Sequence, residues 1–336
     1  MKIDLIAFTD AGFELADRLA ALLAEEGEET WAFNAHADKS LSADEWTRRG
    51  FETAAALVYV GACGIAVRKI APCVRSKLTD PAVLVIDEKG QFVISLLSGH
   101  VGGANDLALR AARLLNAIPV VTTATDVNGL FAIDAWAARQ GLAIADSKRI
   151  KRVSGRLLAG ETLRVRSEFP IAGTPPKGFV LVEEEPWDVL ISCRAAEAGE
   201  ALRLVPRCLS VGMGARRGIE PEAVRACFRA ALEKGGLDPL AVKSVCTIDL
   251  KKDEGGLLAL CRELGLDLRC YAAEELLAVE GDFTASTFVK SVTGVDNVCE
   301  RSAVLDSGGG RLLVPKTALN GVTAAIAMGE VSLKFN

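Results

Sequence analysis

Metal-binding patterns of cysteine and histidine are missing from this sequence. Its 336 residues contain only two histidines, His36 and His100, which lie too far apart along the chain to show the ligand spacing of a zinc site. None of the nine cysteines forms a C-x-x-C pair, and an odd number in a chain of this length argues against a disulfide framework. We therefore expect reduced thiols, as in cytosolic proteins, and no metal ligands.

The sequence also lacks a basic excess and a membrane-spanning segment. Its formal net charge is −5, whereas nucleic-acid-binding domains carry an excess of lysine and arginine. The longest apolar run, "AAALVYVGACGIAV", is too short to cross a bilayer and ends at Arg68. The first residues, "MKIDLIAFTD", have an acid at position 4 and no signal-peptide core. These absences predict a cytoplasmic protein without nucleic-acid or membrane partners.

Fingerprints of several enzyme classes are absent as well. There is neither a G-x-G-x-x-G nor a P-loop sequence, so a nucleotide-binding α/β enzyme is a disfavoured alternative. There is no G-x-S-x-G motif of the serine hydrolases either.

Predicted strands and helices alternate along most of the chain. Apolar runs such as "AALVYVG" and "AVLVID" are typical of buried strands, and "GANDLALRAARLLNA" of an amphipathic helix. We predict an α/β protein with a mostly parallel N-terminal sheet domain (residues 1–134), a small α+β middle region (135–206) and a C-terminal α/β domain (207–336). Ligands of such sheets bind beyond the carboxyl ends of the strands. The loops "YVGACGIAVR", "LLSGHVGG" and "VVTTATD" are therefore expected to gather at one edge.

His100 stands in the glycine-rich segment "SLLSGHVGGAND", between a predicted strand and a predicted helix. An unperturbed pKa of about 6.5 makes histidine suited to proton transfer at neutral pH. His100 is therefore either a polar turn residue or part of a loop that receives a ligand. The other histidine, His36, lies in a polar segment without glycines, and we expect it at the surface.

The segment "VVTTATDVNG" carries hydroxyls and a carboxylate directly after a predicted strand. Thr122, Thr123 and Asp126 could hold a polar substrate or orient a histidine, or they could cap the next helix. Spacing alone assigns no Ser/His/Asp triad.

The segment "VGMGARRGIEPEAV" is the clearest candidate for binding an anion. Glycines such as Gly212 and Gly214 allow close backbone approach, and the free N–H groups of a helix N-terminus favour a carboxylate or phosphate. Arg216 and Arg217 could add bidentate contacts to a carboxylate. The alternative is a tight turn with two solvated arginines. Lys316 and Asn320, predicted just after a strand, are likewise either ligand contacts or surface residues.

Several of these stretches together resemble the cobalt-precorrin-5A hydrolase family of anaerobic cobalamin biosynthesis. They occur in order, cover most of residues 55–330, and read "GACGIAVRKIAP", "KLTDPAVLVIDEKGQFVISLLSGHVGGAND", "TTATDVNG", "VGMGARRG", "TGVDNVCERSA" and "LVPKTALNGVTAAIA". The C-terminal third also resembles a small stand-alone protein of the aerobic cobalamin route, which supports a boundary near residue 207.

The resemblance implies that the chain opens the ring A δ-lactone of cobalt-precorrin-5A with water and releases acetaldehyde, giving cobalt-precorrin-5B. Cobalt belongs to that substrate, so no cofactor of the protein's own is expected. The substrate carries many carboxylates, and cationic loops would have to attract it to a protein of net charge −5. Neighbouring methyltransferases of the pathway are candidate partners.

Lactone opening needs an activated water and a stabilised oxyanion. We predict His100 as the general base, with Asp126 steering its ring and Thr123 or Thr122 holding water or oxyanion together with the N–H groups of the loop glycines. The residues predicted to bind substrate are Gly64, Arg68, Ser98, Gly99, Gly102, Gly103, Asn105, Thr122, Gly212, Gly214, Arg216, Arg217, Lys316 and Asn320.

A non-catalytic carrier is the alternative from another functional class. It would bind the corrin intermediate through the same arginine loops and pass it to the next enzyme. Only the hydrolase needs a competent acid–base residue.

Overall fold

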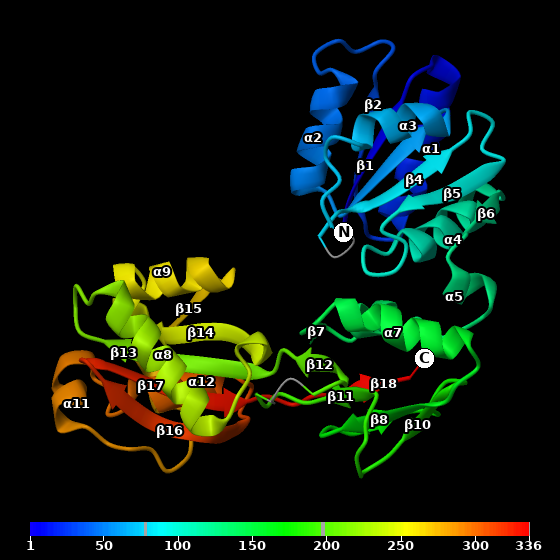
Figure 1. Ribbon diagram of the computed structural model, residues 1–336. Helices are drawn as coiled ribbons and strands as arrows, with labels where there is room; N and C mark the ends of the chain where they lie inside the picture. The colour runs from blue at the N-terminus through cyan, green and yellow to red at the C-terminus, as the bar shows by residue number, and fades with distance from the viewer. Residues whose placement is uncertain (77–78, 196–198, 336) are drawn as a thin grey trace. The chain divides into compact units, whose positions relative to one another are not determined.

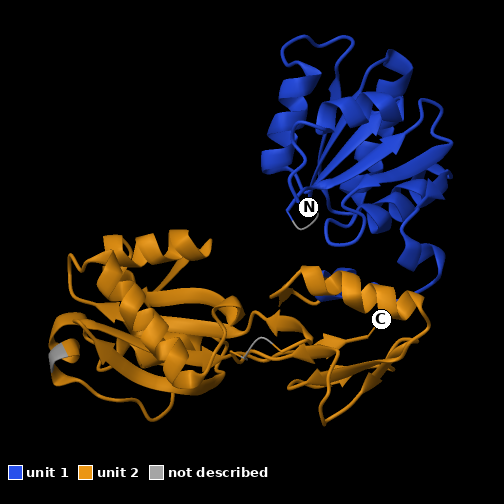
Figure 2. Ribbon diagram, viewed as in Figure 1, with its two compact units in different colours: residues 1–138 blue, residues 139–336 orange. Residues whose placement is uncertain are grey.

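The chain folds into two compact units, residues 1–138 and 139–336 (Figure 2). The computed structural model describes residues 1–76, 79–195 and 199–335 (Figure 1), so Lys77 and Leu78 of the "KLTDPAV" segment lie outside the described residues. No helix in these ranges is long and apolar enough to span a membrane.

The first unit is built on a six-stranded sheet in the order β2-β1-β3-β4-β5-β6. All neighbouring strands in it pair in parallel except β4 and β5, which are antiparallel. The strands are β1 (Lys2–Ala7), β2 (Glu29–Asn34), β3 (Ala56–Val60), β4 (Ala82–Ile86), β5 (Phe92–Leu97) and β6 (Ile118–Val120).

Helices cover both faces of this sheet, which explains why its central strands are apolar throughout (Figure 1). Side chains alternate across each strand, so Val58 and Leu84 pack with α1 and α4, whereas Leu57 and Val83 pack with α2 and α3. The helices are α1 (Asp10–Glu25), α2 (Ala43–Thr53), α3 (Cys63–Ile70) and α4 (Ala104–Leu115), followed by the short α5 (Ala124–Val127) and α6 (Ile133–Arg139).

The reversal of β5 corrects the expectation that three loops gather at one edge. Leu97 pairs opposite Val83 and Val93 opposite Ile86, so the carboxyl end of β5 lies beside the amino end of β4. Because β6 runs parallel to β5, the His100 loop and the "VVTTATD" loop share that edge. The segment after β3 leaves the sheet at the opposite edge, a strand length of roughly 16 Å away, and its Gly64 and Arg68 lie in α3.

The second unit begins with a sheet in the order β10-β8-β11-β12-β7, in which only β7 is antiparallel to its neighbour. Leu142–Ile144 form β7, and the Asp146 carboxylate accepts the N–H of Lys148, where α7 begins. Its elements are β7, α7 (Lys148–Leu158), β8 (Leu163–Ser167), β10 (Phe179–Leu181), β11 (Val189–Ile191) and β12 (Leu202–Pro206), with β9 (Ile171–Ala172) pairing with β18 (Leu333–Lys334).

The unit continues with a third sheet, in the order β15-β14-β13-β17-β16. Its first three strands are parallel, β17 is antiparallel to β13, and β16 is antiparallel to β17. The elements are β13 (Leu209–Ala215), α8 (Pro221–Gly235), η1 (Pro239–Ala241), β14 (Val242–Ile248), η2 (Asp249–Lys251), α9 (Gly255–Leu264), β15 (Leu268–Tyr271), α10 (Ala273–Leu277), α11 (Thr287–Thr293), α12 (Val298–Asp306), β16 (Arg311–Leu319) and β17 (Val322–Met328).

A buried carboxylate fixes α12 to this third sheet. Asp306 accepts hydroxyl hydrogen bonds from three adjacent strands: from Ser210 at 2.5 Å, from Ser244, and from Tyr271 at 2.7 Å. Burial raises the pKa of Asp306, but the hydrogen bonds from these hydroxyls outweigh it and the net shift is downward. The group therefore stays ionised as a satisfied structural anchor.

Gly212 lies under α12, and this corrects its predicted place in a ligand-binding loop. It is a buried residue within β13. A Cβ atom there would lie 1.9 Å from the carbonyl oxygen of Cys299 and 2.7 Å from the amide nitrogen of Ala303. Both neighbours are backbone atoms of α12, so the glycine is required by helix–sheet packing.

We predict that Gly212→Ala lowers the free energy of unfolding by about 3 kcal/mol, because α12 must shift to admit the methyl group. Gly155→Ala is the matched control, since Gly155 lies inside α7 with nothing within 4 Å of an added Cβ. The control should stabilise the chain by about 0.5–1 kcal/mol. Urea unfolding of both variants checks this, and equal stability of the two would contradict the packing role of Gly212.

Candidate active site

The His100 loop is a tight turn between β5 and α4. Ser98 has a left-handed backbone with φ of 58°, uncommon for a residue with a side chain, and Gly103 follows with φ of 81°. The N–H groups of Ala104 and Asn105 donate to the carbonyls of Ser98 and Gly99, at 3.1 and 3.0 Å. The loop therefore satisfies the first N–H groups of α4 itself and presents His100 in a fixed position.

The imidazole of His100 lies between two carboxylates. Its Nε2 atom is 2.8 Å from Oδ2 of Asp126 and 3.1 Å from the hydroxyl of Thr125. Its Nδ1 atom is 3.2 Å from Oδ1 of Asp134. The ring is only 17% exposed, the carboxylate of Asp134 5% and that of Asp126 36%. Asp126 is the carboxylate predicted from the sequence, whereas Asp134 was not predicted because it stands alone in the apolar segment "FAIDAW".

Asn105 connects this group to the strands. Its amide nitrogen donates to Thr123 Oγ1 at 2.8 Å and to Asp126 Oδ2 at 3.1 Å, and its amide oxygen accepts from Ser95 at 2.7 Å. Thr123 in turn donates to Asp126 at 2.5 Å. Gly99 leaves room for this amide, since a Cβ on it would lie 2.7 Å from Asn105 Oδ1. The network holds one oxygen of Asp126 against His100.

The two carboxylates hold His100 in its protonated form. The hydrogen bond to Asp134 is the largest cause, burial opposes it, and the bond to Asp126 adds to it, which together raise the pKa of His100 to about 9. Burial raises the pKa of Asp126, but the hydrogen bonds from Thr123 and His100 lower it by more than burial raises it. The net shift of that pKa is therefore downward. At neutral pH the site is therefore an imidazolium between carboxylates, and His100 can accept a proton only after it has donated one.

Not every predicted donor of the oxyanion site is free in this conformation. The N–H of Gly103 donates to the carbonyl of His100 at 3.0 Å, which corrects its predicted role. The N–H of Gly102 has no acceptor among the described residues. This position requires glycine, because an added Cβ atom would lie 2.4 Å from the Cβ atom of Ser98. Thr122 is exposed. The buried hydroxyl of Ser98 has no hydrogen-bond partner in the described part of the chain, which is unusual for such a group.

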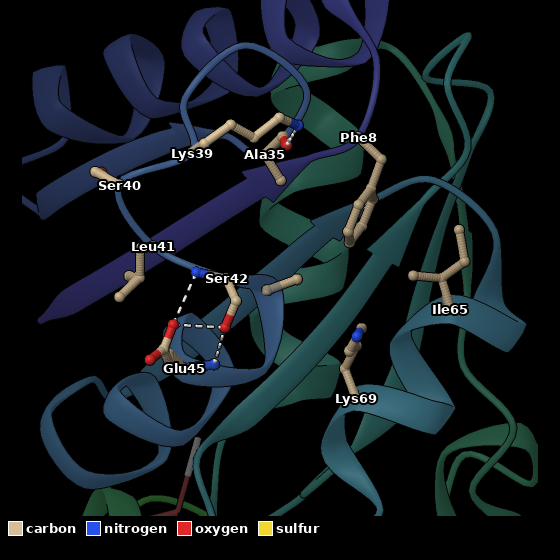
Figure 3. A pocket seen from close by; sticks show the side chains of 10 residues that line it. Phe8, Ala35, Lys39, Ser40, Leu41, Ser42, Glu45, Ile65 and Lys69 are labelled. Carbon is tan, nitrogen blue, oxygen red and sulfur yellow. Dashed lines mark hydrogen bonds between the residues drawn. The ribbon is translucent and has the colours of Figure 1, made fainter.

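A pocket of about 550 Å³ lies at the other edge of the sheet, where β1, β2 and β3 end (Figure 3). The amine of Lys69 is bound to Asp44 at 2.9 Å, and that of Lys39 donates to the carbonyl of Ala35 at 2.8 Å. Both lysine amines of this pocket are therefore already hydrogen-bonded within the chain. Its lining residues are Phe8, Ala35, Lys39, Ser40, Leu41, Ser42, Ala43, Glu45, Ile65 and Lys69.

Gly64 and Arg68 belong to this second edge. Both are exposed residues of α3, and the guanidinium of Arg68 donates to the carbonyl of Gly64 at 3.1 Å. The structure does not bring them to the His100 cluster.

The predicted anion site of the second unit is partly filled by the chain's own carboxylate. Glu254, a buried residue, accepts from the N–H groups of Gly218 at 3.0 Å and Ile219 at 3.1 Å. These amides are therefore occupied. Arg216 and Arg217 are both exposed. The glutamate thus fixes a loop that presents two guanidinium groups.

The hairpin β16–β17 places Asn320 beside this arginine loop. Asn320 and Gly321 form its left-handed turn, with φ of 51° and 80°, and the N–H of Arg216 lies 3.4 Å from the carbonyl of Gly321. Gly214 is the next-to-last residue of β13, where a Cβ would lie 2.8 Å from the hydroxyl of Thr323. Lys316 was predicted just after a strand but lies within β16. Its backbone N–H donates to the buried carboxylate of Glu300 at 2.6 Å.

Among the described residues, no group of three or more His, Cys, Asp or Glu side chains could hold a metal ion.

Two family models match the chain. The model described as "Cobalamin synthesis G N-terminal" matches residues 45–126, and the model described as "Cobalamin synthesis G C-terminus" matches residues 209–327. The first match contains His100, Asn105 and Asp126, and the second contains the arginine loop.

Two curated relatives are similar over most of their length. A cobalt-precorrin-5A hydrolase of Salmonella typhimurium is 35% identical, and the alignment covers 98% of each chain. A cobalt-precorrin-5A hydrolase of Priestia megaterium is 32% identical over 83% of this chain and 79% of the relative. Among solved structures, CobE, a protein from the cobalamin (vitamin B12) biosynthetic pathway, aligns at 30% identity with a TM-score of 0.35, covering 37% of this chain and 91% of that one.

The raised pKa of His100 predicts a pH-dependent contribution to stability. Because the pKa rises from 6.5 unfolded to about 9 folded, the contribution is fully present below pH 6.5 and is lost as the pH rises through 9. It should amount to on the order of 3 kcal/mol. Urea unfolding of the wild type and His100→Gln between pH 5 and 10 measures it as the difference in free energy of unfolding. A difference that grows with pH would instead show a neutral imidazole in the folded state.

Proposed function

The chain belongs to the cobalt-precorrin-5A hydrolase family, and we propose that His100 and Asp126 carry out the proton transfers of the reaction that gives the family its name. The chain is a hydrolase, and its substrate is cobalt-precorrin-5A. One observation supports the assignment of residues above all others: the two nitrogens of the His100 imidazole lie 2.8 and 3.2 Å from carboxylate oxygens, in the loop "SGHVGGAND".

The proposed reaction is hydrolysis of the ring A δ-lactone with loss of acetaldehyde. Water adds to the acyl carbon, the acyl–oxygen bond breaks, and the ring A acetate is released as a carboxylic acid. The oxygen left on the two-carbon fragment becomes the carbonyl of acetaldehyde when the carbon–carbon bond breaks. The bonding electron pair passes to the macrocycle, which takes up one proton. The products together contain the atoms of the lactone and of one water.

In the first step, Asp126 accepts a proton from the attacking water and His100 donates its Nε2 proton to the departing lactone oxygen. The geometry supports these roles because the Asp126 carboxylate is partly exposed while the imidazole is protonated at neutral pH. Thr123 and Asn105 hold the carboxylate in place through hydrogen bonds. The N–H of Gly102 and the hydroxyl of Thr122 are the proposed donors to the oxyanion.

In the second step, His100 acts as a general base, whereas the sequence predicted it as the base that activates water in the first step. Having given up a proton, it is a neutral imidazole beside the new hydroxyl group, and it takes that hydroxyl proton as the carbon–carbon bond breaks. The proton held by Asp126 passes to the macrocycle. Both residues then have the charges with which they began, so the cycle closes without an external acid or base.

We propose that the substrate's carboxylates bind the exposed guanidinium groups of the second unit. Arg216 and Arg217 suit this role because a planar guanidinium binds carboxylate through two hydrogen bonds. Ser98, Gly99 and Gly103 would then contribute by shaping the His100 loop. Cobalt enters as part of the substrate, so the proposed chemistry requires no resident cofactor. A cytoplasmic location and contacts with neighbouring methyltransferases remain predictions.

His100→Ala should lower kcat for acetaldehyde release by about 10²–10⁴-fold, because both proton transfers lose their donor or acceptor. The assay measures acetaldehyde from purified protein with enzymatically prepared cobalt-precorrin-5A in excess. His36→Ala is the matched control, since His36 is exposed and belongs to no part of the site.

Near-normal turnover by His100→Ala would assign the proton transfers to other groups. If the wild type bound cobalt-precorrin-5A tightly and released no acetaldehyde, the chain would be a carrier instead.

A further inference from the structure

Asp134 contacts His100 from a more buried position than any other polar group of the site. It lies in the first turn of α6, its side chain is 5% exposed, and its Oδ1 atom also accepts the N–H of Ala135 at 3.1 Å. A carboxylate this far from water is costly to ionise unless a cation or several donors face it. The Nδ1–H of the His100 imidazolium, at 3.2 Å, is one such partner.

The two nitrogens of His100 therefore have different surroundings. Nδ1 faces the buried Asp134, whereas Nε2 faces the more exposed Asp126 and the hydroxyl of Thr125. The Nε2 side of the ring therefore has the more exposed of the two carboxylate neighbours. The partner of the other nitrogen decides which tautomer a neutral imidazole adopts.

We infer that Asp134 is a positioning residue whose carboxylate retains the Nδ1 proton of His100, so that only the Nε2 proton is exchanged with the substrate. The inference rests on the proposed function where it names His100 as the residue that transfers the proton. After donation the ring is the Nδ1–H tautomer, with a lone pair on Nε2 that can accept the proton of the second step. Without Asp134 the neutral ring can keep its proton on Nε2, and that tautomer cannot serve as the base.

Two charged groups of the described chain act on this ring. Asp134 approaches it from α6 and Asp126 from α5, and both raise the pKa of His100, the hydrogen bond to Asp134 most of all. Loss of either charge should lower that pKa, but only loss of Asp134 should change the tautomer. This difference separates positioning by Asp134 from a general effect of negative charge.

The test is a ¹⁵N NMR titration of the imidazole between pH 5 and 11. His36→Gln leaves one histidine in the chain, so the signals are those of His100. We expect a pKa of about 9 and, above it, the Nδ1–H tautomer. In Asp134→Asn the pKa should fall by at least about one unit, and the fraction of the Nδ1–H tautomer should decrease. Asp126→Asn should also lower the pKa but should keep the Nδ1–H tautomer.

Two variants control for folding and for charge. Asp17→Asn removes one negative charge from an exposed position of α1 in the same unit and should leave the titration unchanged. Asp134→Glu keeps a carboxylate and should retain a pKa above that of Asp134→Asn. An unchanged pKa and tautomer in Asp134→Asn would overturn the inference. If Asp134→Asn does not fold, Asp134→Glu tests the inference instead. A wild-type pKa of His100 in Asp134→Glu together with the Nε2–H tautomer would overturn the inference.

The rate of acetaldehyde release provides a readout that a purely structural role would not move. In the wild type, the rate should fall as the pH rises through about 9, since the proton donor is lost. In Asp134→Asn this alkaline limb should move down by the same interval as the NMR pKa. A wild type that shows the expected titration but releases no acetaldehyde would refute the proposed function and leave the positioning of His100 by Asp134 standing.

Discussion

The connection between β4 and β5 decides at which edge of the sheet the candidate site lies. Only residues 87–91 separate the two strands, and a parallel crossover needs a dozen or more. The strands must therefore form a hairpin, which reverses β5 and, through it, the direction of β6. The His100 loop and the Asp126 segment consequently leave the sheet at the same edge and can meet. The glycine loop after β3 leaves at the other edge, beside the pocket.

At that shared edge, local geometry and charge depend on one another. In the turn from β5 into α4, the first N–H groups of the helix donate to carbonyls of the loop itself. The imidazole of His100 is bound by side chains instead. Two carboxylates in a half-buried site need a cation between them, and the imidazolium supplies it. The hydrogen bonds of Thr123 and Asn105 then fix which oxygen of Asp126 it meets. The result is an imidazole that is held in its protonated form between two carboxylates.

Glycines of the second unit show how a motif can have two physical causes. The segment "VGMGARRG" has the composition of an anion-binding loop, yet Gly212 is required by the backbone of α12 and the amides of Gly218 and Ile219 bind Glu254. What remains for a ligand is the pair of exposed arginines. Sequence cannot separate these causes, because close approach by a helix and close approach by a ligand both demand the absence of a side chain.

The sequence by itself determined the α/β alternation, the candidate loops and the choice of His100 as a candidate site residue, since apolar periodicity, glycine clusters and a histidine in a glycine-rich loop are local features. The family followed from motifs in order along the chain. Only the tertiary structure decided which loops share an edge, because strand direction depends on pairing between distant segments. Only the tertiary structure revealed the contact of Asp134 with His100. In the sequence Asp134 is a single acidic residue in an apolar segment, which gives no signal of that contact. The tertiary structure also set the charge of His100, which depends on neighbours 26 and 34 residues away along the chain.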